Sequence, residues 1–195
     1  MNDKKFELTD ECKKIGEIKL FRIKALIDFG NVKSGDLGGF IEKEENLSHD
    51  GDAWVSGNAY VYDDAQVYGD AQICGNAEVC DNARIYGHAQ VYDNAYVRGN
   101  AYVHGNARVC GNARVCGNAE VCDNADYATV KGFGTVFRNA TFFRCKDKRI
   151  CVSCGCFYGT INQFREQVKR TRKGKIAKEY LMIADLMEMH FGKEV

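Results

Sequence analysis

The sequence lacks proline altogether and has no excess of charge of either sign. Its 27 basic and 27 acidic side chains cancel, so no overall field draws the chain to nucleic acid or to an anionic membrane. No stretch approaches the roughly 20 apolar residues of a membrane span, and the charged start MNDKKFELTDECKK lacks the apolar segment of a secretion signal. We therefore expect a cytoplasmic protein without a membrane partner, in which nucleic-acid binding would need a local basic patch.

Cysteine, in contrast, occurs ten times. Because the cytoplasm keeps thiols reduced, we expect these cysteines to be free or metal-bound rather than joined in disulfides. Three of them end successive copies of nearly the same six residues in GNARVCGNARVCGNAEVC, residues 105–122. This stretch is either a metal-binding array or a structural repeat in which cysteine fills one position.

A six-residue repeat runs through the middle of the chain. Starting at Gly51, thirteen hexads follow one another without interruption to Ala128. The first position is always Gly or Asp, and the second is Asn or Asp except at His88. The third position is always Ala, and the fifth is Val or Ile except at Tyr127. Such regularity predicts that residues 51–128 form one repetitive structural unit.

Each hexad predicts a short strand followed by a corner. Strand side chains alternate between two faces, so the Ala and the Val point inward while the fourth and sixth positions point outward. Gly, Asp and Asn tolerate left-handed backbone conformations and suit a corner. Three such sides close a triangular coil of about eighteen residues, which indicates a mainly β, single-stranded parallel β-helix of hexapeptide repeats. Gly-Asn every six residues excludes a long helix, and a sandwich does not need so constant a period.

This coil places Cys110, Cys116 and Cys122 on three different sides. They cannot converge on one zinc ion, whose sulfur ligands lie ~2.3 Å from the metal. The repeat is therefore interpreted as structural, with cysteine in outward positions.

The outward positions are rich in aromatic residues and arginine. On a rigid sheet such residues are typical of binding interfaces, because they bury a large area at a small entropic cost. High strand propensity and stacking between coils explain the same residues without any partner, and the sequence leaves both interpretations open. The predicted ligand-binding or interface residues are Tyr68, Tyr86, Tyr92, Tyr96, Arg98, Tyr102, His104, Arg108 and Arg114.

The segments that flank the repeat are predicted to cap its open ends, because uncapped strand edges invite polymerisation. Residues 1–50 are expected to form a capping segment with an irregular first coil. Residues 129–159 are expected to form a terminal coil, a loop and a β-hairpin. Residues 160–195 are expected to form two helices that cover the last coil, the first starting at a capping box that spans Thr160 and Gln163.

The coil resembles the left-handed β-helix of the hexapeptide acyltransferase superfamily, whose enzymes use acetyl-CoA and usually assemble as trimers. The segments FRIKALIDFGNVKSGDLGGFIEKEENLS, DNADYATVKGFGTVFRNATFF and SCGCFYGTINQF, with the G-N-A-x-V-x array, resemble more specifically a group of bacterial, phage and prophage hexapeptide-repeat proteins. Members of that group are named as transferases or polymer-forming proteins without a demonstrated activity. The resemblance implies a left-handed coil and a homotrimer.

An acyltransferase needs a general base, usually histidine, to activate its acceptor. His104, which points outward beneath Tyr86 and beside Tyr102, is the candidate catalytic residue, and acetyl-CoA would be the cosubstrate. Against this hypothesis, the hexads contain no interrupting loop of the kind with which superfamily enzymes shape an acceptor pocket. His88 and His104 also do not supply the three intersubunit histidines of the zinc-dependent variant of this fold.

Four cysteines near the C-terminus form a second candidate site, in which Cys151, Cys154 and Cys156 are the candidate zinc ligands. Together with Cys145 their spacing is C-x5-C-x2-C-x-C, which departs from paired C-x2-C ligand sets. Small thiols packed as apolar groups under the helical cap are the favoured explanation, so we expect no bound metal. The basic stretch KRTRKGKIAK, residues 169–178, lacks interleaved aromatic residues and is interpreted as a solvated connection between helices.

The leading hypothesis is a non-catalytic, trimeric binding or scaffold protein that needs no cofactor and recognises a protein or a small molecule. It would act in the cytoplasm, or in the host cytoplasm if a phage encodes it. One alternative is a divergent acyltransferase with an intersubunit site. A further alternative is a phage anti-defence protein that sequesters a nucleotide signal at a subunit cleft, because aromatic and arginine side chains suit stacked bases and phosphates.

Overall fold

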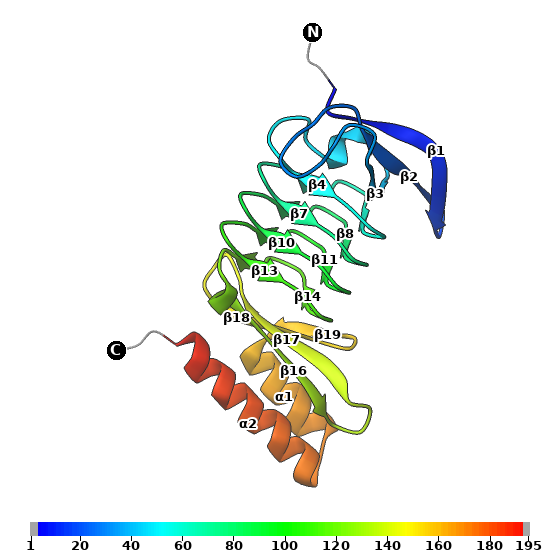
Figure 1. Cartoon of the computed structure of the whole chain (residues 1–195). Helices are drawn as coiled ribbons and strands as arrows, with labels where there is room; N and C mark the ends of the chain where they lie inside the picture. The colour runs from blue at the N-terminus through cyan, green and yellow to red at the C-terminus, as the bar shows by residue number, and fades with distance from the viewer. Residues whose placement is uncertain (1–3, 193–195) are drawn as a thin grey trace.

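The structure, a computed structural model, describes residues 4–192, which form a parallel β-solenoid with a smaller unit at each end (Figure 1). The outermost residues of the two predicted caps, 1–3 and 193–195, lie outside the described residues. Twelve two-residue strands make up the solenoid: β4 (Trp54–Val55), β5 (Tyr60–Val61), β6 (Gln66–Val67), β7 (Gln72–Ile73), β8 (Glu78–Val79), β9 (Arg84–Ile85), β10 (Gln90–Val91), β11 (Tyr96–Val97), β12 (Tyr102–Val103), β13 (Arg108–Val109), β14 (Arg114–Val115) and β15 (Glu120–Val121).

These strands stack into three parallel sheets, which we call sides A, B and C. Side A contains β4, β7, β10 and β13, side B contains β5, β8, β11 and β14, and side C contains β6, β9, β12 and β15. On side A, Gln90 pairs with Gln72 in the coil above and with Arg108 in the coil below. Strands therefore pair three hexads apart, which confirms the predicted triangular coil.

The inward positions form the core of the solenoid. Every third-position Ala and fifth-position Val or Ile from Ala53 to Val121 is at most 1 % exposed. Complete burial of a valine or isoleucine side chain stabilises the fold by about 1.5–3 kcal/mol. The prediction that these two positions face inward is confirmed.

The first position of each of these hexads is a corner with positive φ, and aspartate replaces glycine at three of them. Asp63, Asp81 and Asp93 have φ values of 56°, 58° and 60°. Their carboxylates accept the backbone N–H of the corresponding residue in the next coil, as Asp81 does from Gly99 at 2.9 Å and Asp93 from Gly111 at 3.0 Å. Aspartate is therefore favoured at a corner because its hydrogen bond offsets part of the strain.

The N-terminal unit adds an incomplete first coil to the solenoid. Its elements are the antiparallel hairpin of β1 (Phe6–Ile15) and β2 (Ile18–Ala25), then β3 (Leu37–Ile41) and the 3-10 turn η1 (Glu44–Asn46). β3 pairs in parallel with β5, and Leu47 bridges Val67 on side C. The ammonium of the buried Lys5 donates hydrogen bonds to the carbonyls of Gly51 (3.2 Å) and Ala53 (2.9 Å). Lys5 thereby caps the uppermost strand of side A.

The hairpin of β1 and β2 also covers the upper part of side B. Leu20 on β2 and Phe40 on β3 form a buried cluster with two outward residues of side B, Tyr62 and Cys80. Tyr96 packs at the edge of this cluster. Part of the outward aromatic set therefore contributes to the packing of the chain on itself.

Alkaline pH is expected to weaken this cluster. Burial raises the pKa of the Cys80 thiol, whereas a thiol in the unfolded chain ionises near pH ~8.5. As the pH rises, the thiol therefore loses its proton in the unfolded state before it does so in the folded state. The stability that this thiol contributes is present below the pKa of the unfolded chain and is lost above it. Between about pH 7.5 and 9.5 the protein should therefore lose more stability than its Cys80→Ala variant. Denaturant unfolding at both pH values measures this difference, and equal losses would contradict it.

The C-terminal unit begins with a four-stranded antiparallel sheet of order β16-β17-β18-β19. Its elements are the 3-10 turn η2 (Asn124–Asp126), β16 (Tyr127–Phe133), β17 (Arg138–Arg144), β18 (Ile150–Cys154) and β19 (Phe157–Thr160). The predicted hairpin is present as β17 and β18, but the prediction of a terminal coil within residues 129–159 is wrong. The thirteenth hexad forms η2, where the carboxylate of Asp123 accepts the N–H of Ala125. Because the repeat loses its phase after this point, the chain pairs with itself in antiparallel strands instead of continuing the coil.

This sheet closes the lower end of the solenoid on all three sides. The capping hydrogen bonds join Arg108 N–H to Asn124 Oδ1 (2.8 Å), the Tyr127 hydroxyl to the Arg108 carbonyl (2.6 Å), Arg114 N–H to Thr141 Oγ1 (2.9 Å) and Lys146 N–H to the Asn118 carbonyl (2.9 Å). Strand edges that are capped in this way do not pair with a second chain.

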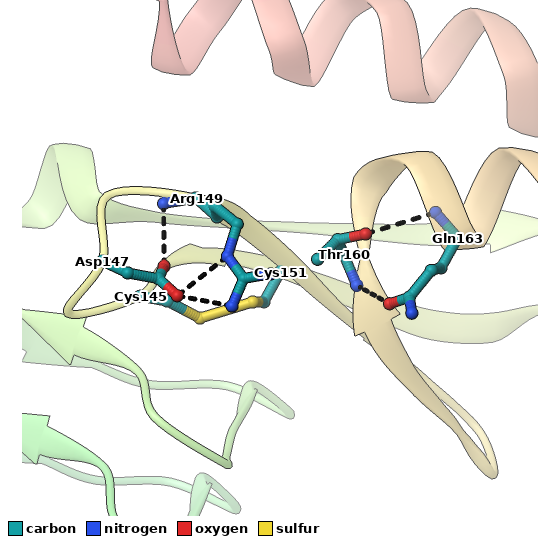
Figure 2. The surroundings of a disulfide bond; sticks show 6 residues. All are labelled: Cys145, Asp147, Arg149, Cys151, Thr160 and Gln163. Carbon is teal, nitrogen blue, oxygen red and sulfur yellow. Dashed lines mark hydrogen bonds and ion pairs between the residues drawn. A yellow bond between two sulfur atoms is a disulfide. The ribbon is translucent and has the colours of Figure 1, made fainter.

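Two helices, α1 (Ile161–Thr171) and α2 (Gly174–Phe191), complete the chain. The predicted capping box is confirmed, because Thr160 Oγ1 accepts the Gln163 N–H at 3.3 Å and the Gln163 side chain accepts the Thr160 N–H at 2.8 Å (Figure 2). The expectation that the helices cover the last coil is wrong. They form a second core with residues such as Phe142 of β17, on the face of the sheet opposite the solenoid (Figure 1). Neither helix is both long and apolar enough to cross a membrane.

Cys145 and Cys151 are joined by a disulfide at the turn between β17 and β18 (Figure 2). The expectation that the cysteines are free or metal-bound is therefore wrong for this pair, whereas the other eight are free thiols. The antiparallel hairpin brings the pair together, because Phe143 lies opposite Cys151 and the Cys145 N–H donates to the Arg149 carbonyl at 2.9 Å. The pairing of β17 with β18 therefore brings these two cysteines together, contrary to the expectation that all thiols stay reduced.

Candidate binding surface

A column of stacked rings follows the sixth positions of side C. The ring centroids of Tyr68 and Tyr86 lie 5.0 Å apart with an interplanar angle of 2°, and those of Tyr86 and His104 lie 4.8 Å apart at 7°. The parallel register places these side chains directly above one another, so the column follows from the repeat itself. All three side chains are half-buried, and the N-terminal hairpin packs over a different side.

A second column, formed by the fourth positions of side C, adds positive charge next to these rings. The guanidinium of Arg84 lies 5.7 Å from the ring centre of Tyr102, and the ammonium of Lys146 lies 3.2 Å from it. Lys146 is held there by a 2.8 Å hydrogen bond to the carbonyl of Asn100. Side C therefore combines aromatic faces with cations that pack on one of them.

His104 closes the lower end of the aromatic column beside acidic and basic groups. Its Nε2 lies 3.9 Å from a carboxylate oxygen of Glu120, and the ammonium of Lys148 lies 3.4 Å from the other oxygen. Burial raises the pKa of the phenols of Tyr68 and Tyr86, so both remain neutral at physiological pH. The predicted candidate base thus has a carboxylate neighbour, while one face of its ring is covered by Tyr86.

Two of the predicted binding residues, Tyr92 and Arg108, lie on side A instead. They line a shallow hollow together with Tyr127 of the C-terminal sheet. At the top of the same side, Trp54 is buried against Phe29, with their ring centroids 5.3 Å apart. Side A therefore carries a smaller exposed aromatic surface than side C.

The remaining predicted residues, Tyr96, Arg98 and Arg114, lie on side B. The Tyr96 hydroxyl accepts a 3.4 Å hydrogen bond from the Cys80 thiol, and the guanidinium of Arg98 lies 5.6 Å from the Tyr96 ring centre. Arg98 and Arg114 are exposed below the hairpin. The structure thus distributes the predicted residues over three sides and brings four of them together on side C. These four are Tyr68, Tyr86, Tyr102 and His104.

Sequence reasoning did not single out Arg84, Glu120 or Lys146 as part of this surface. Arg84 and Glu120 occupy the fourth position of their hexads, so the repeat alone was sufficient to place them beside Tyr102. Lys146 comes from the turn between β17 and β18, and the hexad pattern carries no signal for its return to side C.

The three candidate zinc ligands do not lie together as free thiols. Cys151 is bonded to Cys145, so its sulfur is not available as a thiolate ligand. Cys154 is half-buried at the end of β18, and Cys156 is exposed in the following turn. The three sulfurs therefore do not form a ligand set.

A family model described as "YdcK Beta solenoid repeat" matches residues 89–105 and 107–123. The two matched segments lie in the lower coils and cover well under half of the chain. No curated protein matches the chain. The match and the stacked parallel strands together define the chain as a β-solenoid repeat protein.

Proposed function

We propose that the protein is a non-catalytic binding or scaffold protein that assembles as a homotrimer through the outward faces of its solenoid. The observation that carries this proposal is the stacked column of Tyr68, Tyr86 and His104 on side C. Rigid, half-buried rings of this kind bury a large area at a small entropic cost, as residues at interface centres do. The cations of Arg84 and Lys146 beside them suit a polar rim.

The capped ends favour lateral over end-to-end association. The C-terminal sheet satisfies the lowest strands of all three sides, and Lys5 caps the top of side A. The hairpin of β1 and β2 occupies the upper part of side B. Sides A and C are left available for association between copies. A contact between side C of one copy and side A of the next closes a ring of three when a threefold rotation repeats it.

The continuity of the coils supports binding over catalysis. Strands β4 to β15 follow one another at intervals of six residues, so no inserted loop rises from the coils to wall an acceptor pocket. An acyltransferase site would need such a pocket beside its base, because the acceptor must reach the base within hydrogen-bonding distance.

Light scattering during size-exclusion chromatography tests the assembly. The protein should have three times the mass of its chain, and Tyr86→Ala should weaken the assembly at least about tenfold, because truncating a central aromatic residue costs more than ~1.4 kcal/mol. Gln66→Ala, an exposed change on the same side, is the matched control and should keep the trimer. A monomer in the unmodified protein, or equal dissociation of both variants, would refute the proposal.

Two further proposals place a ligand on the same surface. The pairing of His104 with Glu120 favours an acyltransferase that uses acetyl-CoA. The rings of side C with the cations around Tyr102 favour a phage-encoded protein that sequesters a nucleotide. Thermal denaturation with acetyl-CoA and with a panel of nucleotides separates them. Stabilisation by acetyl-CoA that His104→Ala abolishes supports the enzyme, stabilisation by a nucleotide that Tyr86→Ala abolishes supports sequestration, and neither response favours a protein partner.

A further inference from the structure

Three connections of the C-terminal unit meet at one end and enclose a cavity of about 90 Å³. They are the loop between β16 and β17, the turn between β18 and β19, and the segment that joins α1 to α2 (Figure 1). Because about 10–15 Å³ of such space is enough for one water molecule, the cavity has room for a small organic anion. It lies on the far side of the sheet from the solenoid and is independent of the surface on side C.

Aromatic side chains make the floor of this cavity and hold it in shape. The Phe164 ring of α1 packs against Phe157 at 5.5 Å and against Tyr180 at 5.9 Å between ring centroids. The Tyr180 hydroxyl donates a 3.3 Å hydrogen bond to the carbonyl of Phe133, which ties α2 to the end of β16. The floor is therefore apolar and is fixed by contacts among four separate elements, α1, α2, β16 and β19.

Two arginines line the same cavity without a counterion. Arg138, at the start of β17, and Arg172, between the helices, are both exposed, and neither forms an ion pair with a carboxylate within residues 4–192. No aspartate or glutamate is among the lining residues. Three arginines of this unit, Arg144, Arg149 and Arg165, are paired with carboxylates, Arg165 with both Asp185 and Glu188 at 2.7 Å each.

Two other titratable groups that line the cavity, Cys154 and Tyr180, add no charge to that of the arginines. Burial raises the pKa of the Cys154 thiol and of the Tyr180 phenol, although both guanidiniums act in the opposite direction. Both groups are therefore neutral at physiological pH, and the cavity carries two positive charges over an apolar floor. Arg172 donates one long hydrogen bond, of 3.4 Å, to the Thr171 carbonyl. A guanidinium without a carboxylate partner offers a planar, two-pronged donor to an oxyanion.

From this arrangement we propose that the cavity between Arg138 and Arg172 binds a small organic anion. The anionic group, a carboxylate or a phosphate ester, would lie between the two guanidiniums, and a short aromatic or apolar group would contact Phe157 and Phe164. Such a site adds a ligand to the C-terminal unit, whatever partner the solenoid has.

Isothermal titration with phenyl phosphate and with benzoate, at constant ionic strength, tests this site and distinguishes the two anion classes. At least one of the two should bind, and Arg138→Gln/Arg172→Gln should weaken that binding at least about tenfold, as expected for the loss of charge-assisted hydrogen bonds. Both arginines are exposed, so the variant should fold. The control Lys175→Gln/Lys178→Gln removes the same charge from exposed residues that do not line the cavity, and should bind normally.

Protection of Cys154 provides a second readout. A bound anion should slow the reaction of this thiol with iodoacetamide, measured by peptide mass spectrometry, while the exposed Cys12 on β1 should react at an unchanged rate. Equal binding by both double variants would overturn the proposal. Absence of binding by both anions up to about 10 mM would overturn it too, because a dissociation constant above 10 mM corresponds to a binding free energy of less than ~3 kcal/mol.

Discussion

Replacement of Val91 by asparagine is expected to lower the free energy of unfolding by about 4 kcal/mol. Val91 lies on β10, in the middle of side A, and is completely buried. The change removes about 1.5–3 kcal/mol of apolar burial and leaves an amide without partners, which costs about 1–3 kcal/mol more. Because each coil is held mainly by its neighbours above and below, a defect in the middle coil disrupts two interfaces.

The adjacent residue provides the matched control. Gln90 lies on the same strand but points outward, so Gln90→Asn should change stability by less than about 0.5 kcal/mol. Denaturant unfolding followed by circular dichroism measures both variants. Similar losses in the two, or a loss at Val91 below about 1 kcal/mol, would contradict the inward assignment of the fifth position.

Removal of the disulfide is expected to lower the free energy of unfolding by about 2 kcal/mol. Cys145 and Cys151 are separated by six positions, and the chain-entropy relation gives about 2 kcal/mol for a loop of this size. The loop also carries Lys146, which hydrogen-bonds to the carbonyls of Asn100 and Asn118. The loss should therefore appear both in Cys145→Ala/Cys151→Ala and in the unmodified protein under a reducing agent.

Two controls isolate the effect of the disulfide. The double variant should not respond further to the reducing agent, and Cys154→Ala/Cys156→Ala should keep the full response. Thiol titration of the denatured protein should find eight free thiols before reduction, the number that is free in the structure. Ten thiols in the protein before reduction, or stability that is indifferent to reductant, would show that the pair is not bonded.

The coil itself was predictable because every hexad repeats the same pattern of inward and corner residues. The inward Ala and Val, with a left-handed corner at each first position, fix both the strand length and the register between coils. The stacked column on side C follows from that register alone, so the position of His104 beneath Tyr86 was predictable without any structural information. The start of α1 was also predictable, because the capping box at Thr160 depends only on residues that are close in the sequence.

Contacts between segments far apart in the chain were not predictable in the same way. No period links Leu20 of β2 to Tyr62 on side B, so the burial of that part of the outward wall could not be read from the repeat. The C-terminal sheet was missed for a similar reason. Its strands are irregular, and RNATFF looks like one more hexad until its pairing partner is known. The position of Lys146 over Tyr102 depends on this sheet and was missed with it.

The structure of the assembled protein, determined by crystallography or by cryo-electron microscopy, is the most direct test of side C as an interface. Three copies are predicted to lie side by side, with Tyr86 and His104 of each copy buried against its neighbour. A structure in which this column faces solvent, or in which copies join end to end through β4 and β15, would contradict the proposed role of side C.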